Sequence, residues 1–112
     1  MKDLFICSGG INRSRMAVSI ASQMAFEKKI GGYEAIHWGI YSEDAKRVSP
    51  EALQGFDRFF VMEPEMVGIL IGKYEVSPTK IWDLRVEDIP LHEKEAEKRL
   101  RAELTDKIRP YF

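Results

Sequence analysis

Short apolar runs alternate with amphipathic segments along this chain. Four runs predict strands, at residues 4–7, 33–40, 58–62 and 80–84. Three longer segments predict helices, at residues 13–29, 63–71 and 93–108. Alternation of strands and helices favours a parallel sheet whose strands are joined by crossover helices. No internal repeat, low-complexity tract or linker interrupts this pattern, which predicts a single domain over residues 1–112.

Rows of apolar residues identify the buried faces of the first and last predicted helices. Met16, Ile20 and Met24 recur at a spacing of four, and an alanine row adjoins them. The last helix is highly charged, and its predicted inner face carries three apolar residues, Ala96, Leu100 and Leu104. We expect both helices to pack these faces on the sheet.

Turn-forming residues predict where the elements begin and end. The pair at residues 31–32 is Gly-Gly and is expected to end the first helix, while Gly72 ends the second. Ser49 is expected to cap a short helix that has Pro50 at its first position. Residues 44–46 are predicted to form a polar loop, and proline at position 110 stops the last helix.

These elements together predict an α/β fold with three layers and a four-stranded, parallel, doubly wound sheet. Right-handed crossovers place helices on both faces of such a sheet. Ligands of doubly wound sheets bind beyond the carboxyl ends of the strands, where the strand order reverses. The first predicted strand ends at Cys7, which makes the turn after it the first place to look for a site.

Composition excludes several classes of protein. The 112 residues carry a net charge of −1, without the basic excess typical of nucleic-acid-binding surfaces. No apolar run approaches the roughly 20 residues that a membrane helix needs, and the first residues do not resemble a signal peptide. Cys7 is the sole cysteine, which precludes an intrachain disulfide. We therefore expect a cytoplasmic protein that binds neither nucleic acid nor membrane.

The segment from Cys7 to Ser14 has the composition of an anion-binding turn. Gly9 and Gly10 permit positive φ angles and a tight backbone cradle. Successive backbone N–H groups of such a turn point inward, and the following helix N-terminus adds partial positive charge. The residues predicted to contribute to this phosphate cradle are Ser8, Gly9, Gly10, Ile11 and Asn12.

Three side chains of this segment are candidates for catalysis. The field that attracts a phosphate also favours the thiolate form of Cys7, which makes it a nucleophile. Arg13 can bind two phosphoryl oxygens through its planar guanidinium group. Ser14 can donate a hydrogen bond to the thiolate. Each also has a plainer interpretation: Cys7 as a small core residue, Arg13 as a solvated first-turn residue, Ser14 and Asn12 as helix caps.

Cysteine, five residues, arginine and serine resemble the signature of the cysteine-dependent phosphatases. Its position directly after the first strand is similar to the low-molecular-weight protein tyrosine phosphatases, whose loop reads Cys-x-Gly-Asn-Ile-Cys-Arg-Ser-Pro. Cys7, Gly9, Ile11, Arg13 and Ser14 match that loop. More weakly, residues 60–63 and the spacing of Leu84, Val86 and Asp88 resemble a short bacterial and archaeal branch of the family.

Three residues of the loop depart from the family pattern. Gly10 replaces the loop asparagine, Asn12 replaces the second cysteine, and Arg15 replaces the proline. Without the second cysteine, oxidised Cys7 has no resolving thiol nearby. Arg15 adds positive charge at the rim of the loop. None of the three changes removes a reacting group.

The resemblance implies a general acid on a late loop, and two aspartates are candidates. Asp88 follows the fourth predicted strand and is our first choice, although the family's Asp-Pro pair reads Asp88-Ile89-Pro90 here. Asp83, within that strand, is the alternative. Three aromatic residues could form walls of the substrate cleft or belong to the core: Trp38, Tyr41 and Trp82.

The function that the resemblance implies is hydrolysis of phosphate monoesters through phosphocysteine, without a metal or an organic cofactor. The expected partner is a phosphotyrosine protein or a small aryl phosphate. An inactive module that binds phosphate or phosphoproteins is the alternative. Arsenate reduction on the same fold is disfavoured, because its thioredoxin-coupled form needs further cysteines and Cys7 stands alone.

Overall fold

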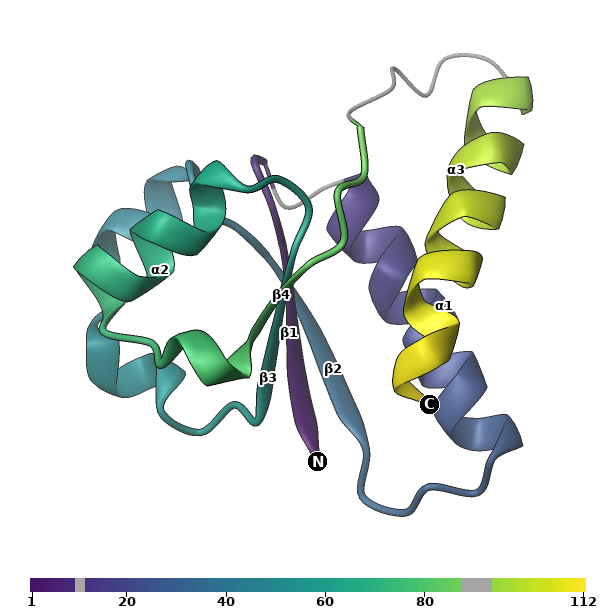
Figure 1. Ribbon diagram of the computed structural model, residues 1–112, viewed down its shortest axis with the longest axis horizontal. Coiled ribbons are helices and arrows are strands. Elements are labelled where there is room, and N and C mark those ends of the chain that lie inside the picture. Colours follow the sequence, from purple (N-terminus) through teal and green to yellow (C-terminus); the bar gives the residue numbers. More distant parts are fainter. Residues whose placement is uncertain (10–11, 88–93) are drawn as a thin grey trace.

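The computed structural model describes residues 1–9, 12–87 and 94–112 of the chain, and its elements follow the predicted order (Figure 1). The strands are β1 (Lys2–Cys7), β2 (Glu34–Gly39), β3 (Arg58–Val61) and β4 (Ile81–Asp83). The α-helices are α1 (Arg13–Glu27), α2 (Glu65–Tyr74) and α3 (Lys94–Ile108). Short 3₁₀ helices are η1 (Glu43–Arg47), η2 (Pro50–Leu53), η3 (Pro78–Lys80) and η4 (Arg109–Tyr111).

The sheet has the order β2-β1-β3-β4, and all three strand pairs are parallel. The chain passes from β1 to one side for β2 and then crosses to the other side for β3. The strand order therefore reverses at β1, and the carboxyl end of β1 is the switch point at which doubly wound sheets bind ligands. The predicted fold class is confirmed.

Helices cover both faces of the sheet. Figure 1 shows α1 and α3 side by side on one face and α2 on the other. The core on the α1 and α3 side contains the predicted inner residues of both helices, including Met16, Ile20, Leu100 and Leu104. The second core, which packs under α2, is built around Met66, Leu70 and Tyr74. The central strands β1 and β3 lie between the two cores. In β3, the residues from Phe59 to Val61 are almost fully buried.

The prediction for the end of α1 was wrong by two residues. The helix ends at Glu27, before Gly31 and Gly32, and Lys29 adopts a left-handed conformation with φ 57°. The backbone N–H of Ile30 reaches back to the carbonyl of Ala25 at 2.9 Å, which closes the helix end. A lysine thus occupies the position that sequence preference assigns to glycine.

The prediction that α2 stops at Gly72 was also wrong. The helix passes through Gly72 to Tyr74, and Glu75 takes the left-handed cap position with φ 56°. Tyr74 is buried and donates its hydroxyl to the carbonyl of Ala45 at 3.0 Å. Burial of this large side chain outweighs the roughly 1 kcal/mol that an interior glycine costs a helix.

The remaining boundaries agree closely, with one change of type. Residues 44–46 lie within η1 rather than in a loop, because Ser42 caps it by accepting the N–H of Ala45 and the Ala45 side chain is buried. Pro50 does begin η2, but Ser49 makes no side-chain capping bond. Within the described ranges, no helix is long and apolar enough to cross a membrane.

Candidate functional site

Cys7 and Ser14 meet at the carboxyl end of β1. Cys7 is the last residue of that strand, and Ser14 lies in the first turn of α1. The Cys7 Sγ and Ser14 Oγ atoms are 3.1 Å apart and hydrogen-bonded, and both residues are buried. When Cys7 is ionised, the Ser14 hydroxyl is the donor, which stabilises the thiolate.

The turn between β1 and α1 is fastened to the chain that leaves β2. The N–H of Ile40 donates to the carbonyl of Cys7 at 2.9 Å, and the N–H of Tyr41 donates to that of Ser8 at 3.0 Å. Gly9 does not adopt a positive φ angle, contrary to our prediction, and borders open space. The predicted roles of Gly10 and Ile11 lie outside the described residues.

Asn12 precedes α1, but its side chain makes no capping bond. Its carbonyl accepts the N–H of Met16 at 3.2 Å, so Asn12 starts the helix through its backbone alone. The alternative interpretation of Asn12 as a side-chain helix cap is therefore excluded, and its role in the phosphate cradle stays a prediction.

Arg13 is fully buried at the start of α1, which excludes the solvated first-turn interpretation. Its Nη1 atom donates to the carbonyl of Val86 at 2.7 Å, and its Nη2 atom donates to Ser8 Oγ at 3.3 Å. Nη1 also forms an ion pair with Glu63 Oε1 at 2.8 Å. A buried cation at a helix N-terminus is unfavourable without negative partners, and the Glu63 carboxylate supplies one.

Sequence reasoning missed both Glu63 and Val86 as partners of Arg13. Glu63 follows β3 after one intervening residue, and Val86 follows β4 after two. Strands β1, β3 and β4 are parallel neighbours, so their carboxyl ends meet at one edge of the sheet. The signal that could have identified Glu63 is a charged residue just after the buried apolar run at residues 59–62.

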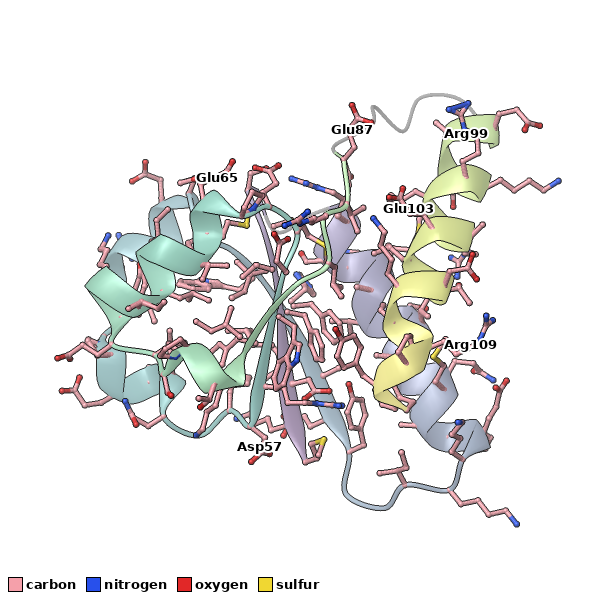
Figure 2. The ribbon with its side chains drawn as sticks, viewed as in Figure 1. Asp57, Glu65, Glu87, Arg99, Glu103 and Arg109 are labelled. Carbon is pink, nitrogen blue, oxygen red and sulfur yellow. The ribbon has the colours of Figure 1, made fainter. Side chains whose placement is uncertain are left out.

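Two further carboxylates, Glu65 and Asp83, interact electrostatically near this site. A backbone hydrogen bond at Glu65 lowers the pKa of its exposed carboxyl group, and a hydrogen bond with Glu63 lowers it further. Arg13 also lowers the pKa of Glu65, whereas the negative charge of Asp83 raises it. Figure 2 shows Glu65 and Glu87 at the end of the molecule where the strands finish, opposite Asp57.

Asp83 is the last residue of β4, as predicted, and serves the turn that follows. Its Oδ1 atom accepts the N–H of Arg85 at 2.9 Å, and its Oδ2 atom is 3.5 Å from Arg85 Nε. Arg85 has a left-handed conformation with φ 51°, which this bond helps to hold. Our first choice of general acid, Asp88, lies outside the described residues.

The three aromatic candidates have different environments. Trp38 packs edge-on against Tyr74, and Trp82 packs against Phe60 and Tyr111, so both belong to the core. Tyr41 is 56 % exposed. Because its backbone is bonded to Ser8, Tyr41 is the one of the three that lies beside the cysteine turn.

Other features of the described residues do not contribute to this site. No group of three or more His, Cys, Asp or Glu residues in the ranges that the structure describes is arranged to hold a metal ion. A cavity of about 460 Å³ lies between α1 and α3, lined by residues such as Gln23, Arg101 and Phe112. None of the residues that line it belongs to the described part of the cysteine turn.

No protein-family model matches this chain, and no curated protein matches it in sequence. Solved structures do match. A cysteine-to-serine mutant of YwlE arginine phosphatase, with a phosphorylated active-site serine, superposes with a TM-score of 0.77 at 16% identity, over 99% of this chain and 93% of that chain. A low-molecular-weight protein tyrosine phosphatase from T. tengcongensis has a TM-score of 0.72 at 22% identity, over 100% of this chain and 99% of that chain.

The tyrosine phosphatase Wzb from Escherichia coli K30, solved in complex with phosphate, has a TM-score of 0.70 at 18% identity. The match covers 98% of this chain and 94% of Wzb. At these identities the likeness is one of fold. The chain therefore has the fold of the low-molecular-weight protein tyrosine phosphatases, with Cys7 at the end of β1.

Proposed function

We propose that this protein hydrolyses phosphate monoesters, with phosphotyrosine as the favoured substrate class, through a phosphocysteine intermediate on Cys7. The observation that carries the proposal is the 3.1 Å contact between Cys7 Sγ and Ser14 Oγ beside the buried guanidinium of Arg13. This arrangement supports Cys7 as the nucleophile, Ser14 as the donor to its anionic form and Arg13 as the phosphate-binding cation, at the switch point of the sheet.

In the first step the Cys7 thiolate attacks phosphorus. A P–S bond forms, the P–O bond to the substrate breaks, and the leaving oxygen takes a proton from a carboxylic acid. Charge on the equatorial oxygens is neutralised by Arg13 and by backbone N–H groups at the start of α1.

In the second step the same carboxylate removes a proton from water, which attacks the phosphocysteine. The P–S bond breaks, and inorganic phosphate and the Cys7 thiolate are released. The hydrogen bond from Ser14 stabilises that thiolate as it leaves. The atoms and charges balance without a redox partner or a metal ion.

Asp88 remains our proposed general acid. Asp83 accepts the Arg85 N–H and is paired with the Arg85 side chain, contacts that give this carboxylate a structural role in its own turn. Val86, two residues before Asp88 in the sequence, accepts the hydrogen bond from Arg13. The chain that leads to Asp88 is therefore fastened to the phosphate-binding arginine.

Turnover of p-nitrophenyl phosphate by freshly reduced protein tests the proposal. We expect hydrolysis by the wild type and none above background for Cys7→Ser. Because the chain has one cysteine, iodoacetate labelling reports on Cys7 alone, and inorganic phosphate should protect it. A wild type that does not turn over the ester, with labelling that phosphate does not slow, would remove the proposal.

The acid is identified by a pair of matched variants, Asp88→Asn and Asp83→Asn. Asp88→Asn should lower kcat for a phenyl phosphate with a poor leaving group by about 10² to 10⁴ and affect p-nitrophenyl phosphate less. Asp83→Asn should mainly lower stability. Equal kcat losses in both variants would contradict the assignment.

The alternative function is capture of phosphorylated partners without hydrolysis. It predicts that phosphate binds and protects Cys7 while no substrate is turned over. We also expect the protein to act on phosphoproteins in the cytoplasm, where a lone thiol stays reduced.

A further inference from the structure

The ion pair between Arg13 and Glu63 lies within the proposed site. Glu63 Oε1 is 2.8 Å from Arg13 Nη1, and the Glu63 side chain is 29 % exposed while that of Arg13 is 2 % exposed. The carboxylate thus contacts the buried arginine and is also open to solvent.

We propose that Glu63 is a specificity-determining residue, which weakens the binding of bare anions at Arg13 and favours phosphotyrosine segments with lysine or arginine next to the phosphorylated residue. The inference rests on the proposed function and deepens it by naming the substrate class. It follows from the charge balance around one guanidinium group.

The contacts of Arg13 show which part of its guanidinium lies against Glu63. Nη1 donates to the Val86 carbonyl and pairs with Glu63, whereas Nη2 donates to Ser8 Oγ. The negative charge of Glu63 is therefore held against Nη1.

The charge of Glu63 has a cost for anion binding. A phosphate dianion next to Arg13 also lies close to a carboxylate that already neutralises the arginine. Repulsion at this range in a partly buried site changes an affinity by about tenfold. A positive charge on the substrate, placed beside Glu63, would offset this repulsion, and a negative one would add to it.

Neighbouring charges act in the same direction but are held differently. Glu65 and Glu87 are exposed, and Asp83 is paired with Arg85. Among these described carboxylates, Glu63 forms a direct ion pair with Arg13, and the other three do not. Its effect should therefore exceed that of an equally charged neighbour.

The test is Glu63→Gln, which keeps an oxygen acceptor for Nη1 and removes the charge. Binding of inorganic phosphate is measured by calorimetry, which needs no turnover. The value of kcat/KM is measured for two phosphotyrosine peptides that differ only in having lysine or glutamate beside the phosphotyrosine. We expect Glu63→Gln to bind phosphate about tenfold more tightly and to lose most of the wild-type preference for the lysine peptide.

Two matched variants separate the effect of the direct contact with Arg13 from the effect of negative charge elsewhere on the protein. Glu51→Gln removes the same charge from exposed η2 and should leave both readouts unchanged. Glu87→Gln removes an exposed charge at the same end of the sheet (Figure 2) and, unlike Glu65→Gln, leaves the hydrogen bond between Glu65 and Glu63 in place, so its effect should be smaller than that of Glu63→Gln. If Glu63→Gln is unstable, Glu63→Asp keeps the charge on a shorter side chain and should give phosphate an affinity between wild type and the expected value for Gln.

The outcomes distinguish this inference from the proposed function. A wild type that hydrolyses the peptides but shows unchanged or weaker phosphate binding in Glu63→Gln overturns the inference alone. An effect of Glu87→Gln as large as that of Glu63→Gln also overturns it. A wild type that neither binds phosphate nor hydrolyses either peptide overturns the proposed function, and the inference with it.

Discussion

Two arginines, the buried Arg13 and the partly buried Arg58, are paired with carboxylates at opposite ends of the same sheet. At the amino end, Arg58 holds Asp3 through two bonds, Nε to Oδ1 at 2.9 Å and Nη2 to Oδ2 at 2.7 Å. Its Nη1 atom donates to the carbonyl of Tyr111, and the Tyr33 hydroxyl donates to Asp3 Oδ2 at 2.7 Å. This cluster joins β1, β3 and the end of the chain.

The two pairs differ in what their carboxylates can reach. Asp3 is completely buried, and Arg58 lies over the rings of Phe60 and Phe112, so the pair is closed to ligands. Glu63 contacts Arg13 Nη1 through its Oε1 atom and is partly exposed. An arginine–carboxylate pair thus forms a structural clamp where its carboxylate is enclosed, and lies at the proposed ligand site where its carboxylate is open to solvent.

The largest expected effect is loss of catalysis without loss of the fold in Arg13→Lys. Lysine keeps the positive charge but cannot bind two phosphoryl oxygens in one plane. We expect kcat/KM for p-nitrophenyl phosphate to fall by about 10² to 10³. Thermal unfolding should show a much smaller change, and the matched Arg58→Lys variant should keep its activity within about twofold.

The next effect is loss of stability without loss of catalysis in Asp3→Ala. Removing one member of a buried ion pair leaves Arg58 unpaired and costs about 3 kcal/mol of unfolding free energy. Denaturant titration measures this, and turnover per folded molecule should be unchanged. Asp106→Asn, in an exposed pair with Arg109, is the control and should cost less than about 0.5 kcal/mol. A large activity loss in folded Asp3→Ala would contradict the purely structural role of the Asp3–Arg58 pair.

A smaller effect is expected for Tyr41→Ala beside the cysteine turn. The exposed Tyr41 ring offers an aromatic surface to an aryl phosphate, and its loss should raise KM for p-nitrophenyl phosphate about three- to tenfold. The KM of a small alkyl phosphate should not change. Trp82→Phe, in the core, serves as the comparison, since it should alter stability more than KM.

The smallest effect is expected for Tyr33→Phe in the structural clamp. Loss of the hydrogen bond to Asp3 should cost about 1 kcal/mol at neutral pH. Burial, with the hydrogen bond to Asp3, raises the pKa of Tyr33 above its usual value. The folded protein then holds this proton where the unfolded chain loses it, so wild-type stability falls as pH rises above about 10. Tyr33→Phe should show a shallower alkaline fall in urea titrations, and an identical slope would contradict the shift.

The accuracy of the sequence predictions depended on what decides each feature. Apolar runs such as residues 58–62 identified the strands, because burial on both faces requires continuous apolar sequence. The ends of α1 and α2 were wrong, because Lys29 and Glu75 take left-handed cap positions that local preference assigns to glycine. Burial of Tyr74 one turn beyond the expected end of α2 is a tertiary effect.

At the cysteine site, too, some features were determined by the local sequence and others by the tertiary structure. By itself the sequence determined the order and spacing of Cys7, Arg13 and Ser14. These residues lie close together in the chain, at the end of a strand and the start of the next helix, so local structure is enough to bring them to one site. Only the tertiary structure decided that Glu63 and Val86 surround Arg13 and that Asp83 serves its own turn. These residues reach the site because parallel strands end at one edge of the sheet, and strand order is set by packing between distant segments.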